Sequence, residues 1–253
     1  MQAALKSIAL FCLSLFSIQA YADESFPYRD DYSDVPIIEL SDLANESEDV
    51  FIVDVRSQLE FDVIHIANAV NIPMSNRGFE AKVKELQPTG KKIITYCNGH
   101  TCKKSYKAAR RLIAAGLENV YAYDSGIFDW TQANPDKSVL MGVQPAAAEK
   151  LIPKSKLAPH MLDSESFLSQ ATGENAILID VRDNFQRDDS KSLKQSRSVP
   201  VDRFYKWLKA GNGKDQTLYS ADAVGKQVRW LQYYLVEFGY KNYYFLKGGV
   251  AGL

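Results

Sequence analysis

The sequence predicts an α/β protein in which one unit, a mainly parallel sheet flanked by helices, occurs twice. Short apolar strands alternate with amphipathic helices along the chain, which is the pattern of parallel sheets with right-handed crossovers. Shifting the sequence by 123 positions places Cys97 on Ser220 and Gly116 on Gly239, so the alternation is also a repeat. Proline and alanine residues interrupt it between positions 135 and 160.

In each unit the same order of elements can be followed. Nearly continuous apolar runs predict strands that are buried on both faces, at 50–55, 92–96 and 119–123 in the first unit and at 176–182, 217–219 and 243–246 in the second. Helical spacing of apolar residues predicts helices over 103–115 and 224–238. Gly116 stands where a left-handed C-terminal cap is expected.

These patterns divide the chain into five parts. We expect a signal peptide (1–22), an extended N-terminal arm (23–34), a first domain (35–134), a linker (135–160) and a second domain (161–253).

The first part has the features of a secretory signal. Lys6 is its only charge, residues 7–18 are almost wholly apolar, and a small-x-small cleavage site ends at Ala22. The alternative is a retained membrane anchor, but the apolar stretch is shorter than the ~20 residues that span a bilayer. Cys12 is expected to leave with this segment. We therefore expect an exported protein, in the bacterial periplasm.

Composition argues against several function classes. The formal charge of −1 gives no reason to expect nucleic acid or, after signal removal, a membrane as partner. Cys97, Cys102 and three histidines lack the spacing of metal ligands, so neither a metal nor another cofactor is expected. Export permits a disulfide, but a chain of this size can build its core without one.

Cys97 ends a predicted strand, and its loop leads into the next predicted helix. Helix N-termini stabilise an anion by about 0.3–1 kcal/mol, which is less than one pKa unit. Further stabilisation of the thiolate must come from N–H groups of the loop and from Lys103 and Lys104. The N–H groups can converge on the sulfur because Gly99 can adopt a positive φ. We therefore expect Cys97 to be an accessible thiolate, the form in which a thiol attacks sulfur. The alternative is a small buried residue at a strand end.

Four motifs follow one another in a specific order. They are Asp54-Val55-Arg56, the stretch 60–73, the Cys97 loop and the stretch 124–130. Together they resemble the rhodanese-like family of sulfurtransferases, which carry sulfur as a cysteine persulfide. The resemblance covers nearly everything from 35 to 253 and implies two tandem rhodanese-like domains. Two departures are Ile64, where the family usually has glycine, and Asn98, where it usually has arginine.

The resemblance implies a sulfurtransferase in which Cys97 is the catalytic residue. Cys97 would take sulfur from a small anionic donor, thiosulfate or a persulfide, and pass it to cyanide, a thiol or a thiol-bearing protein. The substrate-binding loop would comprise Asn98, Gly99, His100, Thr101, Cys102 and Lys103, with His100 either assisting a bound anion or merely solvated. Asp54 and Arg56 would give structural support.

Cys102 has three interpretations: a resolving thiol that attacks a persulfide or sulfenic acid on Cys97, a partner in a structural disulfide, or a bystander. A second function hypothesis is therefore a thiol–disulfide redox protein using both cysteines, although their spacing is not C-x-x-C. A third is a non-catalytic sulfur-binding or interaction module. The second domain fits the third hypothesis, because Ser220 without a neighbouring base is a poor nucleophile. In the common two-domain sulfurtransferases the C-terminal half is the active one, so this chain would be reversed.

Overall fold

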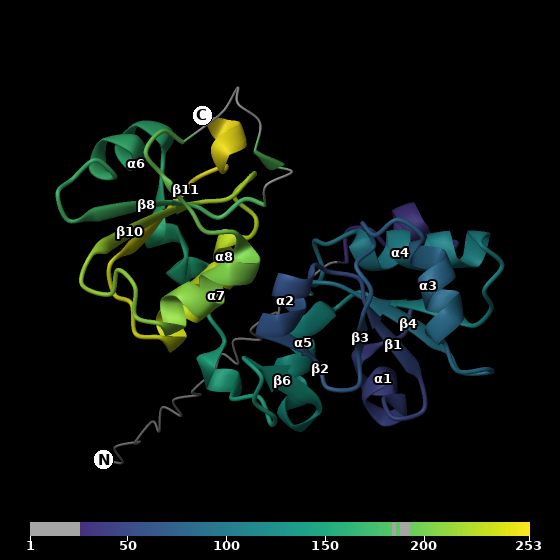
Figure 1. The fold of residues 1–253 in the computed structure, drawn as a ribbon. Helices are drawn as coiled ribbons and strands as arrows, with labels where there is room; N and C mark the ends of the chain where they lie inside the picture. Colours follow the sequence, from purple (N-terminus) through teal and green to yellow (C-terminus); the bar gives the residue numbers. More distant parts are fainter. Residues whose placement is uncertain (1–25, 184–185, 188–192) are drawn as a thin grey trace, which may run out of the picture.

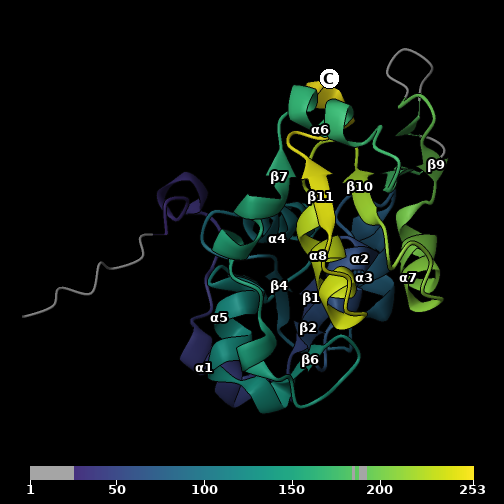
Figure 2. The ribbon, with the colours of Figure 1, turned by 90° about the vertical axis from the view of Figure 1, so that its left-hand side faces the viewer.

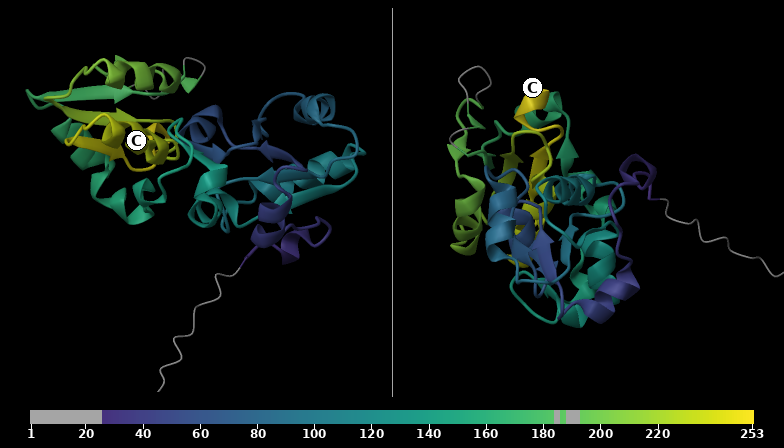
Figure 3. Two further views of the ribbon diagram at one scale, coloured as in Figure 1. Left: turned by 90° about the horizontal axis from the view of Figure 1, so that it is seen from below. Right: turned by 90° about the vertical axis from the view of Figure 1, so that its right-hand side faces the viewer.

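The structure, a computed structural model, describes residues 26–183, 186–187 and 193–253. The predicted signal peptide lies outside the described residues. Figures 1 and 3 show the described chain as two lobes, each with strands at its centre and helices around them. The prediction of two α/β units with mainly parallel sheets is therefore confirmed. In the described part, no helix combines the length and the apolar character needed to cross a bilayer.

The first domain is built on a four-stranded parallel sheet in the order β3-β1-β4-β5. Its strands are β1 (Phe51–Asp54), β3 (Val70–Asn71), β4 (Ile93–Tyr96) and β5 (Val120–Tyr123). Its helices are α1 (Leu40–Glu46), α2 (Gln58–Val63), α3 (Phe79–Leu86), α4 (Lys104–Ala114) and α5 (Gly126–Ala133). The burial of every residue of β1 and β4 explains why these strands read as continuous apolar runs.

Local signals set the ends of the helices beside the site. Ser57 and Glu60 form a capping box that begins α2, in which the Ser57 N–H donates to the Glu60 carboxylate at 3.0 Å. Gly116 follows the C-terminal end of α4, and its φ of +80° is the left-handed conformation expected of a C-terminal cap.

The second domain repeats this plan with five parallel strands in the order β7-β11-β10-β8-β9. Figure 2 shows β7, β11 and β10 side by side in this order. Its strands are β7 (Met161–Leu162), β8 (Ala176–Asp180), β9 (Arg197–Ser198), β10 (Thr217–Ala221) and β11 (Tyr243–Leu246). Its helices are α6 (Ser164–Gln170), α7 (Val201–Lys209) and α8 (Val228–Glu237). Helix α8 follows β10 just as α4 follows β4, so the repeat read from the sequence is structural.

Part of the predicted linker packs on the first domain. Strand β6 (Ser138–Leu140) pairs antiparallel with β2 (Ile64–Ile66), and the Trp130 indole N–H donates to the Lys137 carbonyl at 3.2 Å. The remaining segment contains three short 3-10 helices, η3 (Ala148–Lys150), η4 (Lys154–Lys156) and η5 (Ala158–His160). The connection between the domains therefore begins only after β6.

The two domains share one hydrophobic cluster, which runs from α2 and α5 into α8 (Figure 1). Phe128 of α5 stacks on Trp230 of α8, with 5.8 Å between ring centroids. The Arg229 guanidinium lies 4.0 Å from the Phe128 centroid, and Arg56 of the first domain lies 5.6 Å from the Trp230 ring. The second domain thus packs against the elements that support the Cys97 loop.

The described part of the N-terminal arm packs on α4 of the first domain, whereas the sequence predicted an extended arm. It contains a single 3-10 turn, η1 (Asp30–Tyr32). The Arg110 guanidinium donates to Asp34 at 2.8 Å, and Arg29 reaches Asp124 at 2.8 Å. The first pair joins an acidic residue of the arm to basic α4, and the second joins a basic residue of the arm to an acidic residue after β5.

Candidate active site

The loop from Cys97 to Lys103 joins the C-terminal end of β4 to the N-terminus of α4. It folds back on itself, since the Cys102 N–H donates to the Gly99 carbonyl at 2.7 Å. Gly99 has a φ of +133°, and a side chain there would meet the Ser125 carbonyl oxygen at 2.9 Å. Thr101 is exposed at the outer edge of the loop. The loop is therefore pressed against the start of α5, where only glycine fits.

Cys97 lies beneath this loop. Its side chain is 1% exposed, and its thiol donates to the Cys102 carbonyl at 3.3 Å and to the Ser105 hydroxyl at 3.6 Å. Burial, together with hydrogen bonding to Cys102, raises the pKa of Cys97 well above its ordinary value. The expectation of an accessible, ionised Cys97 is therefore wrong, because an anion at this depth would lose its hydration.

Cys102 has the opposite character. It is half-buried at the entrance to α4, two residues before the first residue of the helix. Hydrogen bonding from the Cys97 side chain lowers the pKa of Cys102 to about 6, against partial desolvation, and the backbone amides of Asn98 and Lys104 act in the same direction. The positive charge of Lys104 adds to this effect. The stabilised sulfur anion expected of this loop is thus that of Cys102.

This difference predicts how the two thiols react with iodoacetamide. Since the pKa of Cys102 is lowered to about 6, its thiolate is present above that pH and is lost as the pH falls through it. We expect the alkylation rate of Cys102 to rise with a midpoint near pH 6, whereas an ordinary cysteine titrates near 8.5. Cys97 should stay unmodified in the folded protein.

The matched variant for this titration is Cys97→Ala, which removes the largest cause of the shift. The midpoint for Cys102 should then move upward. A midpoint near 8.5 in the unsubstituted protein would contradict the lowered pKa.

Asn98 connects the loop to the supporting core. Its amide donates to Glu60 at 2.8 Å and its carbonyl oxygen accepts from Arg56 at 3.2 Å. Although burial raises the pKa of Glu60, the positive charges of Lys104 and Arg56 outweigh it and hold that pKa below its usual value. The Lys104 ammonium lies 3.7 Å from the Glu60 carboxylate. Asn98, at the usual position of an arginine, therefore links the loop to Glu60 and Arg56 through part-buried hydrogen bonds.

Asp54 and Arg56 form a fully buried ion pair, with 2.6 Å between Nη2 and Oδ2. The same guanidinium donates to the Ile64 carbonyl at 2.6 Å, so it ties β1 to β2 as well as to the loop. The corresponding pair in the second domain, Arg182 and Asp180, is joined at 2.8 Å. These contacts are those of structural support.

His100 and Lys103 turn away from the centre of the loop. The His100 Nε2 lies 2.8 Å from the Asp129 carboxylate, and its ring stacks on Phe26 of the arm. The Lys103 ammonium lies 3.2 Å from Asp31, also on the arm. The acidic arm thus pairs with Lys103, while Lys104 is the cation that acts on the Cys102 sulfur. A contact between Lys103 and a bound donor stays a prediction.

In the second domain, the backbone amides of the corresponding loop bind a carboxylate of the same loop. Ser220, at the position of Cys97, is buried. The Asp222 carboxylate accepts the Gly225 N–H and, at 2.5 Å, the Gln227 N–H, which corresponds to that of Lys104 in the repeat. Burial raises the pKa of Asp222, while these amides oppose the rise. The Asp222 carboxylate thus binds the backbone N–H groups that an anionic substrate would need as hydrogen-bond donors.

We therefore expect Ser220→Cys to leave the chain without a second reactive thiol. The new sulfur would be as buried as Cys97, and the amides of its loop would still be bound to Asp222. The measurement is the number of sulfur atoms gained on incubation with thiosulfate, compared with the unsubstituted protein. A further sulfur on the 220 side chain would contradict this prediction.

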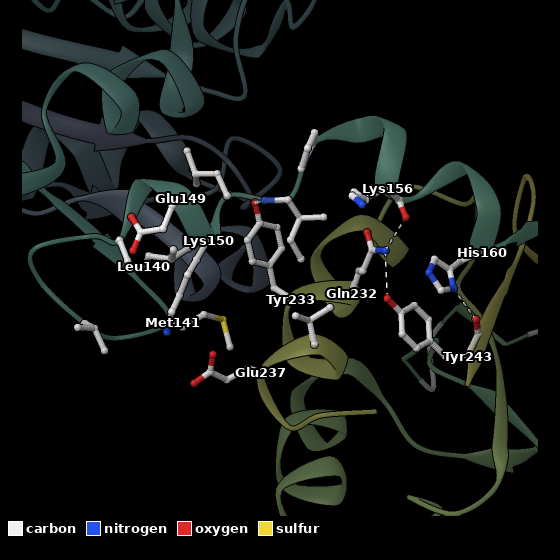
Figure 4. Close-up of a pocket in the computed structure, with 16 residues that line it drawn as sticks. Leu140, Met141, Glu149, Lys150, Lys156, His160, Gln232, Tyr233, Glu237 and Tyr243 are labelled. Atoms are coloured by element: carbon white, nitrogen blue, oxygen red, sulfur yellow. Dashed lines mark hydrogen bonds between the residues drawn. The ribbon is translucent and has the colours of Figure 1, made fainter. Parts of the chain in front are cut away.

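A cavity of about 600 Å³ lies at the domain interface, between β6, the linker and α8 (Figure 4). Tyr233 points into it from α8, and its hydroxyl accepts the Ile152 N–H at 2.9 Å. The lining side chains are mainly apolar, and none of those described belongs to the Cys97–Lys103 loop. The two loop cysteines therefore do not line this cavity.

Comparison with known families agrees with this geometry. Two stretches, residues 38–133 and 164–253, match the family model described as the rhodanese-like domain. The chain belongs to the rhodanese-like family, with two domains in tandem. This family includes sulfurtransferases and related enzymes, so the rhodanese-like protein has a fold suited to sulfur chemistry.

Relatives of the rhodanese-like chain differ in length and activity. It is 42% identical over 87 residues to the tRNA uridine(34) hydroxylase of Cytophaga hutchinsonii, covering 34% of this chain and 27% of the hydroxylase. It is 28% identical over 105 residues to the thiosulfate sulfurtransferase GlpE of Coxiella burnetii, covering 41% of this chain and 92% of that enzyme. A solved thiosulfate sulfurtransferase from Pseudomonas aeruginosa matches 88% of this chain and 45% of its own at 19% identity, with a TM-score of 0.40. The chain thus spans about a quarter of the hydroxylase's length.

Two residues of the rhodanese-like sites escaped the sequence analysis. Ser105 accepts a hydrogen bond from the buried Cys97 thiol, and the signal for it was a small polar residue in the first turn of the helix that follows the loop. Asp222 fills the second loop, and its signal was an acidic residue two positions after the missing nucleophile.

Proposed function

We propose that this protein is a sulfurtransferase that moves sulfane sulfur from thiosulfate or a persulfide donor to a thiophilic acceptor, through a cysteine persulfide in the Cys97–Lys103 loop. The observation that carries this proposal is a half-buried thiol at the start of α4, surrounded by N–H donors and a lysine. Only a thiolate attacks sulfane sulfur efficiently, and these donors stabilise one at neutral pH. The rhodanese-like fold and the Coxiella thiosulfate sulfurtransferase relative support the same chemistry.

In the proposed reaction the thiolate attacks the outer sulfur of thiosulfate, the sulfur–sulfur bond breaks and sulfite leaves with the bonding electrons. The protein is left with a persulfide, whose outer sulfur is then taken by cyanide, a thiol or a thiol-bearing protein. The amides that stabilise the thiolate can also stabilise the persulfide anion. The Lys104 ammonium, at the mouth of the loop, favours a small anionic donor.

The test is incubation with thiosulfate followed by mass spectrometry of the peptide 93–103, which contains both loop cysteines. We expect a gain of one sulfur atom that cyanide removes, with fragment ions between positions 98 and 101 showing which cysteine carries it. The double variant Cys97→Ala/Cys102→Ala is the control. If neither the protein nor the solution shows sulfur transfer or sulfite release, the proposed function is wrong.

We further propose that the protein acts after export, in the bacterial periplasm, on the basis of its N-terminal sequence. N-terminal sequencing of protein recovered from a periplasmic fraction should then begin at Asp23. Recovery of the uncut chain from the cytosol would contradict this.

A second candidate function is a thiol–disulfide redox protein, which the interaction between the two loop thiols favours. The reduction potential of the pair separates the two cases. A potential below about −300 mV would indicate a structural disulfide, whereas a higher one would indicate a pair that exchanges with partners.

A further inference from the structure

The two loop thiols differ in their access to a sulfur donor. Cys97 is 1% exposed, and the loop backbone covers it, since its thiol donates to the carbonyl of Cys102. Cys102 is half-buried, two residues before the first residue of α4. A donor that approaches from solvent therefore meets the Cys102 sulfur first.

The surroundings of Cys102 are also those that the incoming sulfur needs. The amides of Asn98 and Lys104 and the Lys104 ammonium all act on its sulfur, at the entrance of an 11-residue helix. The Cys97 side chain also lowers the pKa of Cys102, and it is itself hydrogen-bonded to the Ser105 hydroxyl. Cys97 is thus a protonated thiol in contact with Cys102, the residue that would carry the persulfide.

We propose, resting on the sulfurtransferase function above, that Cys102 accepts the sulfane sulfur and that Cys97 then releases it as hydrosulfide by closing a Cys97–Cys102 disulfide. This reverses the order of roles expected from the sequence. It also gives the protein an activity beyond sulfur transfer, the conversion of thiosulfate into sulfite and hydrosulfide.

Each step balances. In the first, the Cys102 thiolate attacks the outer sulfur of thiosulfate, giving a Cys102 persulfide anion and sulfite. In the second, the Cys97 sulfur attacks the inner sulfur of the persulfide, the sulfur–sulfur bond of the persulfide breaks, and the Cys97 proton leaves with the outer sulfur as HS⁻. The two cysteines are oxidised to a disulfide and the sulfane sulfur is reduced.

The disulfide ends the cycle until a reductant opens it. The disulfide would close a loop with four residues between the two cysteines, and thiol–disulfide exchange with a reductant would reopen it. The partner that completes turnover is by chemistry a dithiol, either a small molecule or a thiol–disulfide exchange protein. With a monothiol or cyanide in excess, the acceptor instead competes with Cys97 for the outer sulfur.

The experiment is a single turnover of the reduced full chain with one equivalent of thiosulfate and no added thiol. Every variant carries Cys12→Ser, so that the loop holds the only two cysteines. We expect about one equivalent each of sulfite and sulfide, with loss of both free thiols and no retained sulfur. A dithiol should then restore the thiols and permit a second turnover.

The variants separate the two roles. Cys97→Ala should release sulfite but no sulfide and should retain one cyanide-removable sulfur on Cys102, whereas Cys102→Ala should release neither product. Cys97→Ser is the second variant, because its hydroxyl can keep the contacts to Ser105 and the Cys102 carbonyl, and it should behave like Cys97→Ala. The amide protection of β4 checks that each variant is folded.

The outcomes distinguish this inference from the function on which it rests. Retained sulfur on Cys97 in Cys102→Ala, or a stable persulfide without sulfide in the unsubstituted protein, would overturn the inference and leave the sulfurtransferase proposal standing. No sulfite from the unsubstituted protein would overturn both.

Discussion

Gly126→Ala is expected to lower the rate of persulfide formation in the loop by about 100-fold, the effect of a displacement of roughly 1 Å at a reacting group. Gly126 begins α5 with a φ of +77°, and a methyl group there would overlap the backbone of Asn98 and Gly99. The loop would have to move away from α5, taking the amide of Asn98 away from the Cys102 sulfur. The measurement is the initial rate of sulfite release from thiosulfate.

The matched control is Gly116→Ala. Gly116 has nearly the same φ, +80°, but no atom lies within 4 Å of an added methyl group. Both variants bear the cost of a left-handed alanine, about 1–2 kcal/mol, so only the overlap with the loop differs. Equal rates in the two variants would show that the position of the loop does not control the reaction.

Arg56→Met is expected to lower the free energy of unfolding of the first domain by about 3–5 kcal/mol, the usual effect of leaving one member of a buried ion pair alone. Asp54 would keep its charge in the core without the guanidinium, and the Ile64 carbonyl and Asn98 would lose a donor. Hydrogen exchange of β4 during a urea titration reports this domain separately from the second.

Arg182→Met provides the comparison in the second domain. There Arg187 also lies near the Asp180 carboxylate, at 3.6 Å, so the charge keeps a partner. We expect a smaller loss of stability than for Arg56→Met. A loss of equal size in both domains would show that Arg187 does not compensate.

The architecture could be predicted because its signals are local and repeated. Continuous burial of β1 and β4 produces uninterrupted apolar runs, and the end of α4 requires a glycine because its φ is positive. Each signal occurs again in the second domain, and so many matches in the same order do not arise by chance. The two domains followed from these residues alone.

The internal order of the loop could not be predicted in the same way. Spacing shows that Cys97 and Cys102 share a loop at a helix N-terminus, but it does not show which sulfur lies deeper. That depends on the Cys102 N–H turning back to the Gly99 carbonyl and on Ser105 accepting the Cys97 thiol. The contact of Lys103 with the arm could not be predicted, because its partner, Asp31, lies 72 residues earlier in the chain.

The carboxylate of Asp222 has a consequence for the whole molecule. Backbone N–H groups that converge at the N-terminus of a helix repel one another unless a negatively charged group accepts their hydrogen bonds, as Asp222 does. Because the second domain supplies this counter-charge itself, the loop between β10 and α8 has its N–H groups bound without any solute. We therefore expect that domain to support the first domain without binding a sulfur compound itself.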